Sequence, residues 1–228
     1  NEFGYTVHAP ELFADDHLLD LTSTDEEYRK ISIQNLQRTI ETARNLRRHF
    51  SQETDPILIV NVGGWSQEFF LSKKDVSKKT KILKKSLAEL DFSGVQLSIQ
   101  TMPPYPWHFG GQQFHNFFVD PEFIHKFCSE TGVKICLDVS HSMMTSNHLQ
   151  IDFMSEFYSK IKSHVNYMHI VDAKGVDGEG VQIGLGDVHF DELCEALNKD
   201  LPGVAFVPEV WQGHKDFGRG FWDALTFL

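Results

Sequence analysis

Six short apolar runs, rich in β-branched residues and bounded by turn residues, recur along this chain of 228 residues. Runs of this length and composition are typical of strands that are buried in a parallel sheet. They lie at Tyr5–His8, Ile57–Val62, Val95–Gln100, Val133–Asp138, Val165–Val171 and Val204–Glu209. The hydrophobic pattern therefore predicts six parallel strands.

Longer segments with the period of an amphipathic helix lie between these runs. One carries an apolar stripe from Ile33 to Phe50 after the start signal Ser23-Thr24-Asp25. Another begins at Asp120-Pro121 and ends at Gly132, which is the usual order of a polar cap, a first-turn proline and a terminal glycine. Strict alternation of strands and helices predicts a parallel α/β architecture. Because no linker or repeat interrupts it, we expect one domain over residues 1–228.

Composition narrows the class of protein. Apolar residues make up 41% and charged residues 23% of the chain, which is the composition of a globular domain. The 32 acidic against 21 basic residues give a net charge of −11, which disfavours nucleic acid as a partner. No apolar run has the length of a membrane span, so no membrane partner is expected. Three cysteines without a CxxC pair predict reduced, buried thiols and a cytoplasmic location.

Each apolar run ends at or near a side chain that can act on a ligand. These side chains are His8, Asn61, Gln100, Asp138, His169 and Glu209. An open doubly wound sheet gathers its site at one switch point, often with a glycine-rich phosphate loop, and no such loop follows a strand here. A barrel instead brings all of its strand ends to one face. The strand ends therefore favour a barrel, although the strand count alone favours a six-stranded open sheet, because a (β/α)8 barrel needs eight strands.

Four of these side chains, His8, Asp138, His169 and Glu209, are common ligands of divalent ions. A single Asp or His at a strand end is more often a cap or a loop anchor. Mixed carboxylate and imidazole groups on three successive strands favour a shared ligand, because burying them together is costly unless something pairs with them. The sequence therefore predicts one divalent metal site.

Motifs at these positions resemble a known superfamily. They are VHAP at His8, LDVSH at Asp138 and His141, MHIVDAKG at His169 and Asp172, the GxG segment GLGDVHF, and PE at Glu209. Together they resemble the xylose isomerase-like barrel superfamily of sugar isomerases and epimerases, which also contains the endonuclease IV group. The loop MPPYPWHFGGQ further resembles the isomerase-like module found with sialic-acid-synthase-like proteins.

The resemblance implies an α/β fold of the (β/α)8 TIM-barrel type. YTVHAP then corresponds to the third barrel strand, so the first two βα units are absent and we expect the chain to be a fragment of a longer protein. We also expect that these residues alone do not close a barrel. The gap would be filled by the aromatic loop, by another chain or by further residues.

The resemblance also assigns the site. It implies that Gln100, Asp138, His169 and Glu209 bind Mn²⁺, Zn²⁺, Mg²⁺ or Co²⁺, with Glu209 and His141 as the catalytic groups. The family has a Glu where this chain has Gln100, and an amide cannot carry a proton near pH 7. We therefore predict one-base isomerisation that relies on Glu209, and weak two-base epimerisation.

Further residues are assigned to the substrate. His8, Asn61, Trp107, His108 and Asp172 are predicted to bind it, and His141 can contact its oxygens. Trp107 and Phe109 can stack on a sugar ring, or their loop can be a hydrophobic plug. His8 and His141 can equally be ordinary loop anchors.

The predicted function is that of a metal-dependent sugar or sugar-phosphate isomerase or epimerase. Its partner is a small sugar or sugar phosphate, with a homo-oligomer or further domains as other partners. One alternative is a non-catalytic sugar-binding or regulatory domain, since Gln100 replaces the second carboxylate. The other is a metallohydrolase of the endonuclease IV type. Asn61 stands where those enzymes have a His, and Asp187–His189 is interpreted as the start of a helix, so the nuclease is the weaker alternative.

Overall fold

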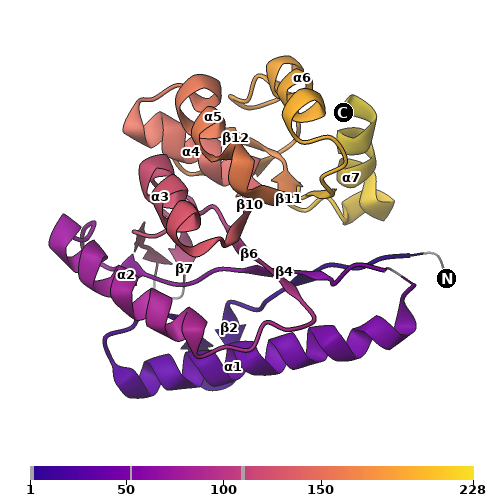
Figure 1. Cartoon of the computed structure of the whole chain (residues 1–228). Helices are drawn as coiled ribbons and strands as arrows, with labels where there is room; N and C mark the ends of the chain where they lie inside the picture. The colour runs from indigo at the N-terminus through magenta and orange to yellow at the C-terminus, as the bar shows by residue number, and fades with distance from the viewer. Residues whose placement is uncertain (1–2, 52, 109–110) are drawn as a thin grey trace.

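A curled, six-stranded parallel sheet forms the centre of the computed structural model, which describes residues 3–51, 53–108 and 111–228 (Figure 1). The strands follow one another in chain order across the sheet, and each neighbouring pair is parallel. They are β1 (Val7–His8), β4 (Ile57–Val60), β6 (Gln96–Gln100), β10 (Lys134–Asp138), β11 (Val165–Ile170) and β14 (Phe206–Pro208). All six predicted strands are present, and each is shorter than its apolar run at one or both ends.

Helices surround the strands, as Figure 1 shows. They are α1 (Glu26–Leu46), α2 (Lys73–Ala88), α3 (Pro121–Thr131), α4 (Val139–Leu149), a π-helical segment (Phe153–Tyr158) continued by α5 (Ser159–Ile161), α6 (Phe190–Asp200) and α7 (Lys215–Phe227). Short 3-10 turns cover Ala14–Asp16, Arg47–His49 and Lys162–His164. The predicted TIM-barrel type of α/β fold is confirmed.

The sheet has two edges within the described residues. β1 pairs only with β4, and β14 pairs only with β11. The described residues therefore form part of a barrel wall and leave it open between β1 and β14, as the resemblance to an eight-stranded family leads us to expect for six strands.

Local sequence signals fix where the helices begin and end. The Asp25 carboxylate caps α1 by accepting hydrogen bonds from the backbone N–H groups of Glu27 and Tyr28. Asp120 caps α3, Pro121 occupies its first turn, and Gly132 ends it with a φ of 74°. That left-handed conformation suits glycine, because a Cβ atom would be strained there.

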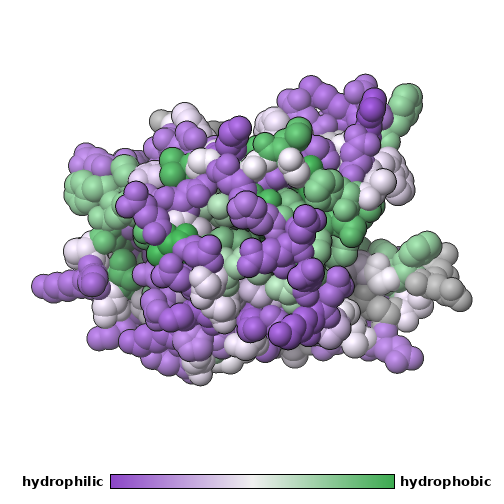
Figure 2. Space-filling view, turned by 90° about the horizontal axis from the view of Figure 1, so that it is seen from above, coloured by the Kyte–Doolittle hydropathy of each residue, from purple (hydrophilic) through white to green (hydrophobic). Residues whose placement is uncertain are grey.

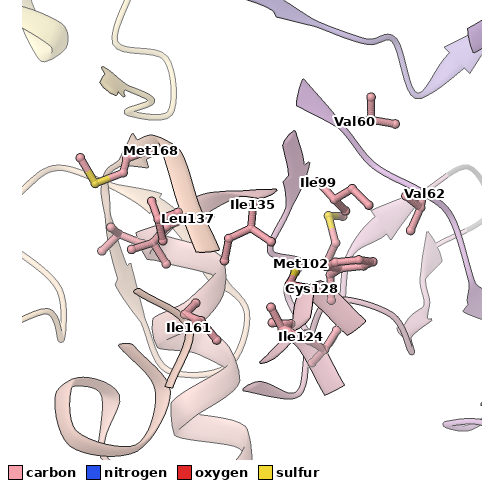
Figure 3. Close-up of a cluster of buried hydrophobic side chains, with 14 of the residues drawn as sticks. Val60, Val62, Ile99, Met102, Ile124, Cys128, Ile135, Leu137, Ile161 and Met168 are labelled. Atoms are coloured by element: carbon pink, nitrogen blue, oxygen red, sulfur yellow. The ribbon is translucent and has the colours of Figure 1, made fainter. Parts of the chain in front are cut away.

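The core lies between the outer face of the sheet and the helices. Figure 3 shows side chains from neighbouring strands, including Val60, Ile99, Ile135 and Leu137, facing Ile124 and other side chains from the helices. Nearly all of their surface is removed from solvent. Each fully buried aliphatic side chain of this kind contributes roughly 1.5–3 kcal/mol to folding, so this layer holds the strand ends in place.

Helix α4 does not appear in the sequence prediction. It follows β10 without a connecting loop, and its buried face contains small polar side chains such as Ser140, Ser142 and Thr145. Because few apolar residues mark that face, the hydrophobic period is weak. Asp138 begins the helix, since its Oδ1 accepts a hydrogen bond of 2.9 Å from the His141 backbone N–H.

Short antiparallel strand pairs lie within the segments that connect the main strands and helices. They are β2 (Leu12–Phe13) with β3 (His17–Leu18), β5 (Trp65–Ser66) with β9 (Phe114–His115), β7 (Trp107–His108) with β8 (Gly111–Gln112), and β12 (Asp172–Lys174) with β13 (Gly178–Val181). The last pair is a hairpin of β12 and β13. It lies between β11 and α6 and contributes to the site described below.

The surface is mainly polar. The face in Figure 2 is mostly hydrophilic, with smaller hydrophobic patches between the polar side chains. In the described ranges, no helix combines the length and apolar character that crossing a membrane requires. The three thiols are free, and Cys128 and Cys136 are buried as predicted, whereas Cys194 is only partly buried.

Candidate active site

The carboxyl ends of neighbouring strands bring the predicted polar residues together. Asp138 is the last residue of β10 and pairs in register with His169 on β11. Glu209 follows β14, and Gln100 is the last residue of β6. Because all strands run the same way, these side chains meet at one end of the sheet.

Three of them form a compact cluster. One ligand atom from each of Asp138, His169 and Glu209 lies within 4.8 Å of the others. His169 Nδ1 is 2.7 Å from Glu209 Oε2 and 3.4 Å from Asp138 Oδ2. Asp138 and His169 are buried, whereas the Glu209 side chain is 53% exposed. Two ligands are therefore fixed in the sheet, and the third reaches in from the solvent side.

A hydrogen-bonded row of side chains extends the cluster toward β1. Gln100 Nε2 donates to Asp138 Oδ2 at 2.9 Å and lies 3.1 Å from His169 Nδ1. Gln100 Oε1 is 2.9 Å from His8 Nε2, and the His8 ring stacks on His169 with centroids 5.6 Å apart. His8 thus orients the amide that faces the cluster.

His141 joins the cluster from the first turn of α4. Its Nδ1 is 2.8 Å from the Thr101 carbonyl oxygen and 3.4 Å from Asp138 Oδ2. Its Nε2 is 3.0 Å from Glu179 Oε1. Both ring nitrogens therefore face acceptors, which is the arrangement that a protonated imidazole requires.

Electrostatic interactions among Asp138, His141 and His169 shift the pKa of each of these groups. Burial alone would raise the pKa of Asp138, but the charges of His141 and His169 and their hydrogen bonds outweigh it and lower that pKa to about 2. Burial lowers the pKa of His141, whereas the Asp138 and Glu179 carboxylates raise it more strongly, to about 10. For His169, hydrogen bonds to Asp138, Cys136 and Glu209 outweigh burial, and the pKa is raised well above its usual range.

The donor set fits a divalent ion, with one difference from the predicted ligands. Two carboxylates and one imidazole converge, which is a mixed N/O set. Gln100, however, faces the cluster with its amide nitrogen. Turning that amide by half a turn would present its oxygen to the cluster and its nitrogen to His8, whose Nε2 can accept as readily as donate.

An ion in this cluster must displace a proton from His169, since the raised pKa keeps that imidazole protonated at neutral pH. We expect binding of Mn²⁺ near pH 7 to release about one proton, and its affinity to rise with pH as the competing proton is removed. Calorimetry in two buffers of different ionisation enthalpy measures this proton release. Binding that releases no proton at pH 7 would contradict the assignment of His169 as a ligand.

A polar cavity of about 340 Å³ opens beside the cluster. It is lined by Gln100, His141 and Glu209, by His8 and Asn61 at the ends of β1 and β4, and by Ala9, Pro10, Glu11 and Glu179. The structure thus brings together most of the predicted catalytic and substrate-binding residues around one space. Its size suits a small molecule with several hydroxyl groups.

Two carboxylates in this cavity were not predicted. Glu11 stands three residues after His8, and its Oε1 accepts a hydrogen bond from Asn61 Nδ2. Glu179 lies on β13, far along the chain from the other site residues. The sequence signal for Glu179 is weak, because a glutamate between Gly178 and Gly180 indicates a turn and does not show which way the hairpin folds.

Asn61 retains an unused hydrogen-bonding atom. Its side chain is buried, and its Oδ1 has no hydrogen-bond partner in the described part of the chain. Leaving a buried polar atom without a hydrogen-bond partner costs folding free energy. This oxygen is therefore suited to accept a hydrogen bond from a hydroxyl group of a ligand in the cavity.

The aromatic loop lies beside the cavity. Trp107 is 70% exposed, and neither Trp107 nor His108 is among the described residues that line the 340 Å³ space. His108 faces a much smaller neighbouring cavity together with Glu11 and Asn61. Phe109 lies outside the described residues. The loop is attached to its neighbours through the pairing of β9 with β5.

Asp172 is also placed away from the cavity. Its fully buried carboxylate accepts hydrogen bonds from the backbone N–H groups of Ala173, Gly184, Gly186 and Val188, at 2.8–3.1 Å. Gly186 packs so closely against it that an added Cβ would lie 2.3 Å from Asp172 Oδ1. Asp172 therefore organises the GxG segment behind the β12–β13 hairpin.

Asp172→Asn should lower the free energy of unfolding by about 2–4 kcal/mol, because an amide group would face N–H donors that now bind a carboxylate. Denaturant unfolding measures the change. Asp177→Asn, at an exposed position of the same hairpin, is the matched control and should change stability by less than about 0.5 kcal/mol. Equal stability of the two variants would show that the four hydrogen bonds contribute little.

The chain belongs to the xylose isomerase-like TIM barrel family, which matches residues 1–224. An uncharacterized protein of Methanocaldococcus jannaschii is 30% identical over 202 residues, which cover 87% of this chain and 67% of that protein. The superfamily inferred from the motifs is thereby confirmed.

Solved structures share the fold. A D-tagatose 3-epimerase-like protein superposes with a TM-score of 0.67 and 22% identity over 97% of this chain and 77% of its own. The 3-keto-D-glucoside 4-epimerase of E. coli gives 0.62 and 16%, covering 91% of this chain and 74% of its own. Endonuclease IV of Thermus thermophilus gives 0.61 and 16%, covering 97% and 73%. Identities this low show a common fold and leave the reaction to be argued from the site.

Proposed function

We propose that this chain is a metal-dependent sugar isomerase or epimerase domain that moves a proton on the carbon next to a carbonyl group. One observation carries the proposal. Asp138, His169 and Glu209 converge at the wall of a polar cavity, and Glu209 belongs both to the cluster and to the cavity lining. A group that can accept a proton thus lines the space in which a sugar would bind.

Each side chain has a definable part in this chemistry. Asp138 and His169, with Glu209 and a turned Gln100, would hold the ion, which when bound polarises a sugar carbonyl and stabilises the enediolate. Glu209 would remove the proton and return it, since it is half-exposed and lines the cavity in which the sugar would bind. His8 and Asn61 would hold hydroxyl groups from the opposite side of the cavity.

The charge of the cavity favours a sugar without a phosphate group. Glu11, Glu179 and Glu209 line it against the protonated imidazole of His141, and among the described lining residues there is no Lys or Arg. A phosphate monoester carries about −1.5 to −2 charges at pH 7 and normally needs cationic or helix N-terminal partners. The same charges oppose the phosphodiester backbone of a nucleic acid.

One observation favours a second candidate, a sugar-binding domain without catalysis. Gln100 replaces a carboxylate of the family pattern, and its amide already satisfies Asp138. Such a domain would keep the cavity and the ion but would transfer no proton.

The test is solvent-deuterium incorporation. Protein loaded with Mn²⁺ is incubated in D₂O with D-fructose or D-tagatose, and separately with D-fructose 6-phosphate. We expect label at the carbon next to the carbonyl of a free sugar, loss of labelling with EDTA, and at least about tenfold slower labelling of the phosphate. Sugar binding without label would support the binding domain, and cleavage of a phosphodiester would support a hydrolase.

A further inference from the structure

Epimerisation inverts the configuration at a carbon atom, so it needs one group that removes a proton from one face and a second group that returns a proton to the other face. Of the two positions at which the family has a carboxylate, this chain keeps only Glu209. Glu209 can remove a proton from one face of a bound sugar. Gln100 cannot return one to the other face, because an amide does not ionise near pH 7. Inversion would therefore require a second carboxylate that reaches the same cavity.

Glu179 is such a carboxylate, and the β12–β13 hairpin holds it in place. The backbone N–H of Gly180, the next residue, lies 3.3 Å from Ser140 Oγ in the first turn of α4. The Gly180 carbonyl oxygen accepts a hydrogen bond of 2.8 Å from the N–H of Trp211, two residues after Glu209. The hairpin is thus attached on both sides of the site, so the position of Glu179 is built into the fold even though its side chain is 57% exposed.

Glu179 and Glu209 are the two ends of one alternating row of acidic and imidazole groups. From Glu209 the row passes to His169 at 2.7 Å, to Asp138 at 3.4 Å, to His141 at 3.4 Å, and to Glu179 at 3.0 Å. Its middle is buried, whereas both terminal carboxylates are half-exposed and line the cavity. A sugar held over the row would have one ionisable carboxylate near each end.

The Glu179 carboxylate has one oxygen available. Oε1 lies against His141 Nε2, and within the described chain Oε2 has no hydrogen-bond partner. His141 donates to Thr101 and Glu179 together, so the contact holds the carboxylate at the edge of the cavity. Glu11, the third carboxylate of the lining, also has one oxygen engaged, by the Asn61 amide, but it is not part of the row that begins at Glu209.

We propose that Glu179 is the second proton-carrying catalytic residue of the site, which replaces the missing carboxylate at Gln100 and allows epimerisation of an unphosphorylated sugar. This inference rests on the proposed function. In one direction Glu209 takes the proton from the carbon next to the carbonyl, the C–H electron pair moves into the enediolate, and protonated Glu179 gives its proton to the opposite face. Glu209 then loses a proton to water and Glu179 gains one, so the site returns to its starting state. The reverse reaction exchanges the two roles.

The experiment separates one-face exchange from inversion. Protein with Mn²⁺ is incubated in D₂O with D-fructose and with D-tagatose, and label is measured in recovered sugar and in the inverted product. For wild type we expect label in both. For Glu179→Gln we expect inversion to fall at least about 100-fold while label in recovered sugar stays within about threefold, since Glu209 still acts alone. Glu179→Asp should restore part of the inversion.

Two further measurements exclude a structural effect. Glu195→Gln, an exposed carboxylate on α6 away from the cavity, should match wild type in both rates. Mn²⁺ affinity should be unchanged in Glu179→Gln, while the imidazole nitrogen signal of His141 in the metal-free protein should shift as its Glu179 contact is lost.

The outcomes are distinguishable. Wild-type protein that labels a sugar but never inverts it, or Glu179→Gln protein that inverts at the wild-type rate, would overturn the role of Glu179 alone. Loss of inversion in Glu11→Gln with none in Glu179→Gln would move that role to Glu11. Wild-type protein that labels neither sugar would overturn the proposed function together with this inference.

Discussion

Glu209→Gln is expected to lower deuterium exchange into a bound sugar about 1000-fold, within the range that a positioned general base contributes. Glutamine keeps the size of the side chain and can still coordinate through its oxygen, but it cannot accept a proton. Glu209 is 2.7 Å from His169 and lines the cavity, so the substitution removes the proposed base from the space in which we propose that the sugar binds. Mass spectrometry of the recovered sugar measures the rate.

The matched control is again Glu195→Gln, which makes the same chemical change on the surface of α6. It should exchange label at the wild-type rate. If Glu209→Gln also remains within about threefold of wild type, Glu209 is not the base, and Glu179 would become the first candidate to replace it.

Asp138→Asn is expected to weaken Mn²⁺ binding by more than about 100-fold, since even outer partners of metal ligands typically contribute 10–100-fold. The substitution removes the buried charge at the centre of the cluster, where Asp138 faces both His169 and His141 at 3.4 Å. It retains an oxygen that can cap α4. Metal analysis after dialysis and calorimetric titration measure the loss.

Asp120→Asn provides a control for the capping role. Asp120 caps α3 as Asp138 caps α4, but it is exposed and lies away from the cluster. Both variants should fold, and Asp120→Asn should bind Mn²⁺ as wild type does. Stoichiometric, tight Mn²⁺ in Asp138→Asn would show that the ion binds elsewhere or that no carboxylate at this position is needed.

The hydrophobic pattern was sufficient to predict the sheet and most of its helices. Apolar runs such as Ile57–Val62 stand out because both faces of a parallel strand are buried. The pattern failed at α4, where the buried side chains are small and polar and the N-cap, Asp138, is also a candidate ligand. It also missed the β12–β13 hairpin, whose strands have three and four residues and whose second strand contains two glycines.

Residues of the site were predictable where strand order alone brings them together. Asp138 and His169 occupy paired positions of adjacent strands. The predicted order of the strands was therefore enough to predict that these two side chains lie close together. The orientation of the Gln100 amide depends on its contacts with His8 and Asp138, which no sequence pattern encodes. Glu179 reaches the cavity because its hairpin is attached to Ser140 and Trp211, and such long-range contacts appear only in the folded chain.

The edge position of β14 has a consequence for local unfolding. Glu209 follows a strand that pairs only with β11, and Phe206 and Val207 within that strand are 41% and 39% exposed. Asp138, by contrast, belongs to a strand enclosed between β6 and β11. The site thus spans segments of high and low expected protection against amide hydrogen exchange. A ligand that engages both carboxylates adds its binding free energy to the protection of the edge strand, so occupancy of the site and order in the last segment of the chain should rise together.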